Sequence, residues 1–402
     1  MHTNGSTSRT SNIRPDKDKR WVAVGSSSHS DAASAGRAAA AEAVGGRNAG
    51  LVVVFCADSY DLEDLLGAVN ESTGGAPLIG CSTAGEIATN GLQKAGVVVT
   101  ALGGDGFSVA TAAAPTSEGL REAGESVAST MEQVEDRPHR VLVLLTDGLA
   151  GDQTEIVRGA YSVLGAKVPL VGGCAGDDLK MQATYQFHGN EVLTGAVVAA
   201  ALSSDSPLGI GVRHGWQRVG EPMVVTGSSS NTVHSLEDQP ALDLYLERLN
   251  APPEARVEGD AFTKFAQTHP LGLDRRAGED HVRLVFGADF EDRSLKLIAE
   301  APKGVMLWFM EGDDGSILDA TEAACEEARN GLGGTDLLGL IAFDCIARRT
   351  VLGDEGVGKE IDRISEQAAG VPFAGFYSYG EIARTRGASG FHNQTLVVLA
   401  VS

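Results

Sequence analysis

The chain has few aromatic residues and lacks a long apolar run. Phe, Trp and Tyr together make up 5% of the 402 residues, and no uninterrupted apolar stretch reaches the roughly 18 residues that a membrane-spanning helix needs. The first twenty residues also lack the apolar segment of a signal peptide. The sequence therefore predicts a cytoplasmic protein without a membrane partner.

Basic residues are scarce compared with acidic ones. The chain has 32 Lys and Arg against 54 Asp and Glu, which gives a formal net charge of -22. A surface that follows the phosphates of a nucleic acid, or binds an anionic membrane, needs an excess of positive charge. We therefore expect no nucleic-acid partner.

Spacings typical of metal sites are absent from the sequence. Neither C-x-x-C, H-E-x-x-H nor H-x-x-x-H occurs. The cysteines are scattered and odd in number, which fits a reducing compartment better than a set of disulfides; they are Cys56, Cys81, Cys174, Cys325 and Cys345. We predict no metal.

Glycine is abundant and the length is sufficient for two hydrophobic cores. The chain has 51 glycines and 43% apolar residues, and single cores usually stop growing below this size. Residues 1–20 are polar and without periodicity, which predicts a disordered tail. We expect one domain over residues 21–237 and a second over residues 238–402.

One motif occurs three times, as "PLIGCSTAGEI" at 77–87, "PLVGGCAGDDL" at 169–179 and "PFAGFYSYGEI" at 372–382. Each copy follows an apolar run of strand length and an amphipathic segment, and a second apolar run follows it. The repeated unit is strand, helix, loop, strand. It predicts an α/β fold in which mixed β-sheets are flanked by helices.

The pattern of apolar and polar residues changes between the second and third copies of the motif. From about residue 209 to 313, short apolar runs alternate with polar or Gly/Pro turns, which predicts antiparallel strands. Helices are expected after Ser30 and around "TEAACEEARNG", with Ser30 and Thr321 as N-caps.

The loops that follow the repeated strands are the candidate ligand site. Acidic residues stand near the ends of the first strands, at Asp58, Asp147 and Asp344, and ligands of α/β sheets collect outside the carboxyl ends of strands. The Gly-rich loops lack the Lys-Ser/Thr of a P-loop and the G-x-G-x-x-G pattern, which disfavours a nucleotide. Main-chain amides at the repeated glycines Gly80, Gly172 and Gly375 would hold a carboxylate. The acidic side chains that close the loops would hold an amine, and these are Glu86, Asp177, Asp178 and Glu381.

Other residues leave alternatives open. Cys81, beside Ser82 and Thr83, is a candidate nucleophile because amides in its loop would lower the thiol pKa, although the local sequence offers no base. Arg348 would clamp a carboxylate or form a salt bridge. Haem would need one axial ligand, for which His188, His214 and His392 are candidates. The complete set predicted to bind the ligand is Gly80, Cys81, Ser82, Thr83, Gly85, Glu86, Asp147, Gly172, Gly173, Asp177, Asp178, Asp344, Arg348, Tyr377, Tyr379, Gly380 and Glu381.

Many ordered segments from residue 22 onward resemble the FIST family of sensory modules, which has the parts FIST N and FIST C. "LVVVFCADSYD", "LIGCSTAGEI", "LVGGCAGDD" and "HGWQRVGEPMVVT" carry the FIST N likeness. The resemblance to FIST C lies in the segments "PALDLYLERL", "IAFDCIARR", "FAGFYSYGEI" and "FHNQTLVVLA".

The resemblance implies binding of a small ligand, such as an amino acid, and signalling through a partner domain. One branch of the family resembles haem-based nitric-oxide sensors. We expect no attached output domain here, so a separate signalling protein would read the bound state. The leading hypothesis is a non-enzymatic cytoplasmic sensor without a cofactor. The alternatives are a haem-based nitric-oxide sensor and a cysteine-dependent hydrolase or transferase that uses Cys81.

Overall fold

The structure is a computed structural model that describes residues 19–93, 95–274, 280–385 and 390–402. Except for Lys19 and Arg20, the predicted tail of residues 1–20 lies outside the described residues. The Arg20 guanidinium donates to the Gly106 carbonyl at 2.8 Å and to the Ser204 hydroxyl at 2.8 Å, and it lies over the Phe107 ring. Arg20 therefore joins the chain's first strand to the second repeat.

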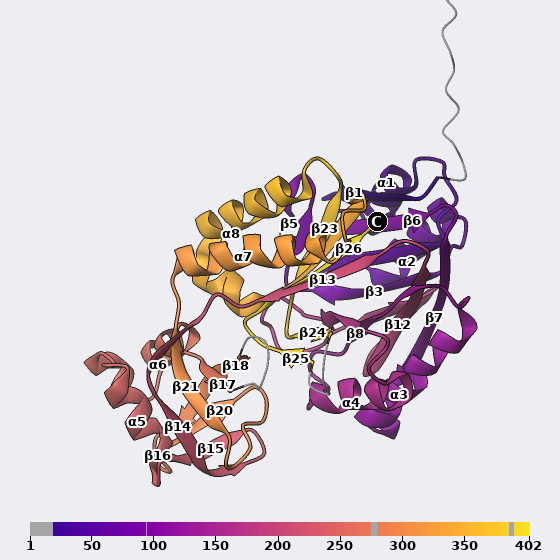
Figure 1. Cartoon of the computed structure of the whole chain (residues 1–402). Coiled ribbons are helices and arrows are strands. Elements are labelled where there is room, and N and C mark those ends of the chain that lie inside the picture. Colours follow the sequence, from indigo (N-terminus) through magenta and orange to yellow (C-terminus); the bar gives the residue numbers. More distant parts are fainter. Residues whose placement is uncertain (1–18, 94, 275–279, 386–389) are drawn as a thin grey trace, which may run out of the picture.

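Three structural repeats make up the body of the protein, each with the order strand, helix, strand, helix, strand, hairpin, strand (Figure 1). The first contains β1 (Trp21–Ser27), α1 (Ala32–Val44), β2 (Leu51–Ala57), α2 (Leu62–Thr73), β3 (Leu78–Thr83), β4 (Glu86–Ala88), β5 (Gly91–Gln93) and β6 (Val97–Gly103). The second contains β7 (Phe107–Pro115), α3 (Leu120–Ala128), β8 (His139–Thr146), α4 (Gln153–Leu164), β9 (Leu170–Cys174), β10 (Gln186–His188), β11 (Glu191–Leu193) and β12 (Ala196–Ser204). The third contains β13 (Leu208–Arg213), α7 (Asp314–Asn330), β22 (Gly339–Cys345), α8 (Ile346–Ala368), β23 (Phe373–Ser378), β24 (Glu381–Arg384), β25 (Phe391–His392) and β26 (Leu396–Val401).

The same strand pairing recurs in all three repeats. β2 pairs parallel with β3 and antiparallel with β6, and β8 and β22 make the equivalent pairs with β9 and β12 and with β23 and β26. The prediction of mixed sheets on a repeated strand-helix-loop-strand unit is confirmed.

Each repeat gives its hairpin to a different sheet. The strand orders are β1-β6-β2-β3-β10-β11, β7-β12-β8-β9-β24-β25 and β13-β26-β22-β23-β4-β5. The hairpin of the first repeat thus completes the third sheet, that of the second completes the first, and that of the third completes the second. The exchange is cyclic, so the repeats are arranged with pseudo-threefold symmetry.

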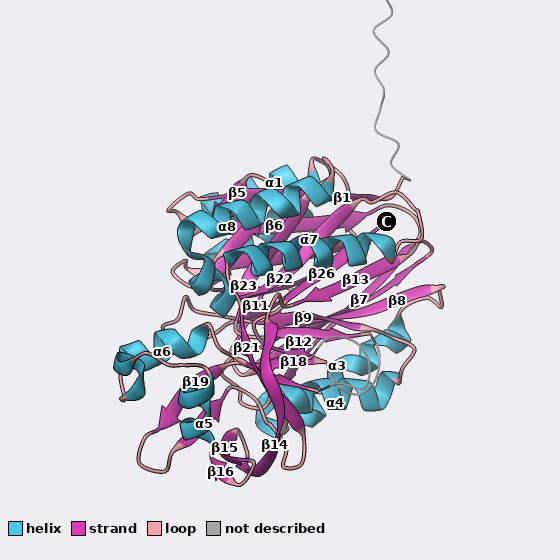
Figure 2. Cartoon of the chain, turned by 60° about the vertical axis from the view of Figure 1, so that its left-hand side comes forward, coloured by secondary structure: helices cyan, strands magenta, loops and turns pink. Residues whose placement is uncertain are grey.

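Each sheet is covered by helices on one face and meets the other sheets on the other face. Figures 1 and 2 show α7 and α8 side by side over the third sheet, with α3 and α4 at the opposite side of the body. Alternate residues of β2 face these two environments: Val52 and Val54 pack with α1 and α2, while Phe55 packs with Phe343 and Phe376 in the centre. Full burial of one such ring contributes about 2 kcal/mol.

An inserted lobe interrupts the third repeat between β13 and α7 and lies at the lower left of Figure 1. One curled sheet holds its strands in the order β18-β17-β21-β14-β15-β20-β19, with β16 paired to β15. This confirms the predicted antiparallel section. The strands are β14 (Gln217–Ser229), β15 (Thr232–Leu236), β16 (Gln239–Pro240), β17 (Leu271–Leu273), β18 (His281–Arg283), β19 (Val285–Asp289), β20 (Ser294–Leu297) and β21 (Met306–Glu311), and the helices are α5 (Ala241–Arg248) and α6 (Asp260–Gln267).

Two predicted caps are wrong. Asp31, not Ser30, accepts the Ser34 amide at the start of α1, because its carboxylate reaches the third amide of the helix. α7 begins at Asp314 with a capping box formed by Asp313 and Ser316, so Thr321 lies inside the helix. Sheet pairing also crosses the predicted domain boundary at 237/238, since β14 and β15 precede it and pair with β21 and β20.

Candidate ligand-binding site

The three repeated glycines lie inside strands and do not present amides to a ligand. Gly80, Gly172 and Gly375 occupy the same register position, where a Cβ atom would overlap the carbonyl oxygen of the neighbouring strand. Opposite them, in the exchanged hairpins, stand Phe187, Ile382 and Ile87. The predicted carboxylate-binding role of these glycines is therefore replaced by a packing role, in which a large apolar residue covers each glycine.

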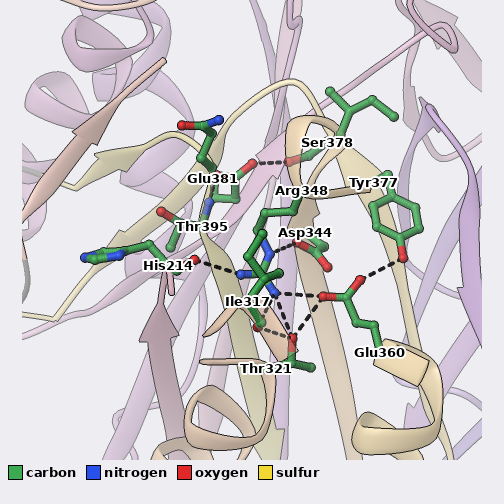
Figure 3. A network of polar contacts seen from close by, with 12 residues as sticks. His214, Ile317, Thr321, Asp344, Arg348, Glu360, Tyr377, Ser378, Glu381 and Thr395 are labelled. Atoms are coloured by element: carbon green, nitrogen blue, oxygen red, sulfur yellow. Dashed lines mark hydrogen bonds and ion pairs between the residues drawn. The ribbon is translucent and has the colours of Figure 1, made fainter. Parts of the chain in front are cut away.

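Glu86 and Glu381 occupy equivalent buried positions, and each accepts hydrogen bonds from within its own repeat. Glu86 accepts from the Thr83 hydroxyl at 2.6 Å and the Gly96 amide at 3.1 Å. Glu381 accepts from the Ser378 hydroxyl at 2.8 Å and the Thr395 amide at 3.2 Å (Figure 3). Burial raises the pKa of Glu86 to about 7 and that of Glu381 to about 8. Neither lines the cavity described below.

In the second repeat, Gln186 occupies the position that Glu86 and Glu381 occupy in the other two. The repeated sequence motif places Asp177 and Asp178 there, and the strand register corrects this. Gln186 pairs with Cys81 as Glu86 pairs with Phe376 and Glu381 with Gly173. Its carbonyl oxygen accepts the Ala196 amide at 3.2 Å, and its amide donates to the Thr184 hydroxyl at 3.3 Å. Residues 177–185 are consequently an extra loop of the second repeat.

Cys81 is buried in the central core, and the pKa of its thiol shifts in the direction opposite to the prediction. Burial raises the pKa of its thiol well above 9.0, whereas the sequence predicted a lowered pKa. The adjacent Ser82 hydroxyl donates to the Gly176 carbonyl at 2.8 Å and accepts the Tyr185 amide at 3.0 Å. The Thr83 hydroxyl donates to Glu86, and Gly85 has a φ of +117°, which favours glycine at this position beside the Arg349 guanidinium. These residues join strand β3 to its surroundings.

Arg348 is the centre of a fully buried charge network (Figure 3). Its guanidinium donates to Asp344 at 2.8 Å and to Glu360 at 2.7 Å, and Glu360 also accepts from the Tyr377 hydroxyl at 3.0 Å. The same guanidinium reaches the Thr321 hydroxyl of α7 at 2.7 Å. Burial, followed by the charge of Glu360, raises the pKa of Asp344 well above 3.8. Of the two sequence alternatives for Arg348, the structure shows the salt bridge.

Tyr379 ties the third repeat to the extra loop of the second. Its hydroxyl donates to the Asp177 carboxylate and accepts the Leu179 amide at 2.7 Å. Asp177 in turn accepts the amides of Met181, Gln182 and Ala183 at 2.7–3.1 Å. Burial alone would raise the pKa of Asp177, but these hydrogen bonds outweigh it and lower the pKa.

The remaining predicted residues surround these contacts. Asp178 pairs with Arg349 at 3.1 Å on the surface. Asp147 is satisfied by the Leu149 and Gly195 amides and by the Thr184 hydroxyl. Gly173 and Gly380 make close packing with Ser378 and with Phe391.

A cavity of about 200 Å³ opens where the second repeat, the third repeat and the inserted lobe meet. The second repeat contributes the turn after β8, the first residue of α4 and the extra loop. The third contributes the start of α8, Tyr379 and the end of the β24–β25 hairpin, and the lobe contributes β19 and the end of β20. The lining residues are Gly148, Gly151, Gln153, Leu179, Met181, Leu284, Phe286, Ile298, Cys345, Ile346, Ala347, Tyr379, Phe391 and Asn393.

Two residues of this cavity wall each have a buried side-chain oxygen without a hydrogen-bond partner among the described residues. These oxygens are Oε1 of Gln153 and Oδ1 of Asn393, whose residues are 3% and 2% exposed. The Gln153 amide donates to the Asp147 carbonyl at 2.8 Å, which leaves its carbonyl oxygen as the remaining polar group. A buried acceptor without a donor costs about 1–3 kcal/mol. A ligand that carries N–H groups would recover this energy.

The opposite kind of polarity comes from a helix terminus. Ile346 and Ala347, which line the cavity, begin α8, whose first helical segment ends at Gly353, where the backbone is non-helical. The first main-chain amides of a helical segment have no carbonyl partner within it and can donate to a negative group. The cavity wall thus contains residues with unpartnered acceptors for a cation and main-chain amides for an anion.

Exposed apolar side chains gather at the cavity mouth. Leu179 and Met181, on the extra loop, are 53% and 57% exposed, and Phe286 and Ile298, on the lobe, are 47% and 39% exposed. They are four of the eight large apolar side chains that are exposed among the described residues, and all four line this one cavity. The backbone φ of Asp178, Leu179 and Met181 is positive, which is costly for such residues and typical of functional loops.

Sequence reasoning named Tyr379 but missed Gln153 and Asn393. Nothing in "GDQTEI" or "GFHNQT" marks an unpartnered oxygen, because pairing depends on the folded surroundings. A weak signal existed for the extra loop, since the second motif copy departs from the "GEI" ending of the others.

The described residues around this site do not fit haem or a metal. No histidine lines the cavity, and burial raises the pKa of Cys345, its cysteine, which opposes thiolate ligation. Among the histidines predicted as axial ligands, His188 bonds Thr111, His392 bonds the Ala383 carbonyl, and His214 accepts the Trp216 amide. The part of the chain that the structure describes contains no group of three His, Cys, Asp or Glu side chains that could hold a metal ion.

Two domain profiles of known protein families match most of the chain. The FIST N domain profile matches residues 50–239, and the FIST C domain profile matches residues 241–384. The chain belongs to the FIST family. FIST domains are sensory domains of signal transduction, so this FIST protein has a sensory role that implies binding of a small ligand.

The FIST protein also resembles mycobacterial proteins. It is 25% identical over 389 residues to an uncharacterized protein of Mycobacterium tuberculosis strain H37Rv, covering 93% of this chain and 97% of the relative. It is 25% identical over 230 residues to an uncharacterized protein of Mycobacterium bovis, covering 56% and 58%. Over the described residues, none of the helices combines the length and apolarity needed to span a bilayer.

Proposed function

We propose that this FIST protein is a cytoplasmic sensor that binds an apolar α-amino acid in the cavity between the second repeat, the third repeat and the inserted lobe. The observation that carries the proposal is that Gln153 and Asn393, which both line one small apolar cavity, each have a buried, unpartnered oxygen. An ammonium group has three donors and no acceptor, so it matches these oxygens. Burying it there removes the cost of two unmet acceptors.

The other parts of an amino acid match the remaining walls. A carboxylate would lie against the first main-chain amides of α8, at Ile346 and Ala347. An apolar side chain would contact Phe286, Ile298 and Met181. The volume of about 200 Å³ is below the range of drug-sized pockets, which fits a metabolite of this size.

Cytoplasmic placement and the output also belong to the proposal. All five cysteines are unpaired and buried, which suits a reducing compartment. We propose that a separate signalling protein reads the bound state and that the sensor itself is not an enzyme.

Thermal shift and calorimetry with L-leucine, L-methionine and L-phenylalanine test the ligand. We expect stabilisation that grows with concentration, because a ligand of the native state stabilises it by mass action. Two analogues of leucine dissect the site: 4-methylpentanoate lacks the amine, and isopentylamine lacks the carboxylate. Both should bind more weakly. Binding of none of the three amino acids, or equal binding of 4-methylpentanoate and L-leucine, would contradict the proposal.

Asn393→Leu removes one unpartnered oxygen while it keeps a side chain of similar size. We expect amino-acid affinity to fall about tenfold or more, since the ammonium loses a charge-assisted hydrogen bond. Thr130→Val is the matched control, because the Thr130 hydroxyl is also buried without a partner among the described residues but does not line the cavity. It should leave affinity unchanged.

The two alternatives have direct tests of their own. A haem-based sensor would show a Soret band after expression with haem, and the mismatch described above predicts a colourless protein. A Cys81 enzyme would need a reactive thiolate, whereas the raised thiol pKa predicts no alkylation of Cys81 in the folded protein at neutral pH.

A further inference from the structure

The inserted lobe joins the body through two short crossings that lie side by side. The chain leaves β13 at Arg213 and enters β14 at Gln217, and it returns from Glu311 of β21 to α7. Gln217 pairs with Glu311, which places the two crossings next to each other. A lobe held in this way can rotate about one line.

Each crossing contains a glycine whose place no other residue can take. Gly215 has a φ of +86°, and a Cβ there would lie 2.7 Å from the Ser316 carbonyl oxygen. A Cβ at Gly312 would lie 2.6 Å from the Trp216 ring. Hinges are commonly built from such small residues at the ends of elements.

The inner end of the lobe is fastened to the body. The Trp216 indole donates to the Gln394 carbonyl at 3.0 Å, and the Gln394 amide donates to the Gln267 carbonyl of the lobe at 2.7 Å. Arg348 donates to the His214 carbonyl at 2.9 Å, as Figure 3 shows. The ring of His281, in the lobe, stacks on that of His392 with centroids 5.2 Å apart.

The outer end of the lobe stands away from the body. A cleft of about 660 Å³ separates Leu149 and Asp152 of the body from Asn231 and Glu300 of the lobe. None of the lobe residues that line this cleft, in the described part of the chain, has a hydrogen bond to the body. Three of the four exposed apolar side chains of the mouth line this cleft, Met181 from the body and Phe286 and Ile298 from the lobe.

We propose that the inserted lobe, over residues 217–274 and 280–311, forms a hinged lid, which rotates about residues 213–216 and 311–313 and closes over the cavity when an amino acid binds. The inference rests on the proposed function. Closure would bury the four exposed apolar side chains of the mouth and exclude water from the site. A ligand favours the closed lid because only that state contacts it on both walls.

Gln394 is the positioning residue that couples the cavity to the hinge. It follows Asn393, whose side chain lines the cavity, and it bonds both the hinge residue Trp216 and the lobe residue Gln267. Its φ of +50° is unusual for glutamine, which makes this turn sensitive to a shift of Asn393. Movement of Asn393 onto an ammonium would therefore move the attachment of the lid.

A disulfide across the outer cleft tests closure. Leu149→Cys and Glu300→Cys place thiols on the two walls, outside the inner cavity, and the native cysteines are buried and do not compete. A disulfide needs the two Cα atoms within about 7 Å, so it records lid closure. We expect L-leucine to accelerate mild oxidative crosslinking by about fivefold or more, a typical allosteric coupling.

Calorimetry on the reduced double variant separates the two proposals. Binding of L-leucine with unchanged crosslinking would overturn the lid and retain the proposed function. If L-leucine, L-methionine and L-phenylalanine all fail to bind, the proposed function falls, and closure driven by an amino acid falls with it. Gln394→Ala should retain L-leucine binding and lose the acceleration, and an acceleration that persists would remove Gln394 from the coupling.

Discussion

Replacing Glu381 by glutamine should make the protein less sensitive to alkaline pH. Glu381 is fully buried, and burial raises the pKa of its carboxyl group from 4.5 to about 8. The folded protein therefore holds this proton more tightly than the unfolded chain. Stability from this proton is complete below pH 4.5 and is lost as the pH rises towards 8, because the carboxyl group of the unfolded chain ionises in this range while the folded protein keeps its proton.

The magnitude follows from the two pKa values. Between pH 5 and pH 8, a carboxyl group with a folded pKa of about 8 and an unfolded pKa of 4.5 contributes a loss of about 3.5 kcal/mol in the free energy of unfolding. Glutamine fits the position, as Gln186 shows in the second repeat, where its oxygen accepts a main-chain amide and its nitrogen donates to a hydroxyl. Glu381→Gln should thus keep both contacts and remove the titration.

Denaturation followed by tryptophan fluorescence at pH 5, 6, 7 and 8 measures this difference. We expect the unfolding free energy of Glu381→Gln relative to the parent to rise steadily with pH. The reverse variant, Gln186→Glu, should introduce the same pH dependence in the second repeat. The reasoning fails if the difference between the parent and Glu381→Gln stays constant within about 0.5 kcal/mol from pH 5 to pH 8.

Three further variants test other contacts. Arg348→Ala should lower the unfolding free energy by about 3–5 kcal/mol, because it leaves two buried carboxyl groups without their cation. The control Arg363→Ala, at a surface ion pair, should lower it by about 1 kcal/mol or less. Equal losses for the two variants in urea denaturation would refute this. Gly375→Ala should prevent accumulation of folded protein in expression trials, whereas Gly358→Ala, in an open helical position, should raise stability by about 0.5–1 kcal/mol. Tyr379→Phe should speed amide exchange at Leu179, and unchanged exchange would show that the hydroxyl does not hold the extra loop.

The repeated strands and the fold class could be predicted because their signals are local. Each Pro-x-x-Gly motif lies beside apolar runs, and the pairing of neighbouring strands follows from the chain order. The exchange of hairpins could not be predicted in this way. Its strands are as short as two or three residues, and the first strand of each hairpin pairs with a strand of another repeat.

The candidate site was harder to predict than the fold because its key atoms have no sequence signature. Glu86 and Glu381 looked like ligands for an amine, yet the fold uses both internally. Gln153 and Asn393 looked ordinary, and only the folded neighbourhood leaves their oxygens without donors. The equivalence of Gln186 to the glutamates was hidden by the extra loop of residues 177–185, which shifts it along the chain.

The cyclic exchange of hairpins also determines how the protein can be made. A ribosome that has synthesised the first two repeats has produced a second sheet whose edge at β9 is still open, since β24 and β25 are translated near the end. The nascent chain thus carries an unpaired edge strand through about half of its synthesis, a known route to aggregation. A fragment that ends at the junction of FIST N and FIST C keeps the same open edge, because β24 belongs to FIST C.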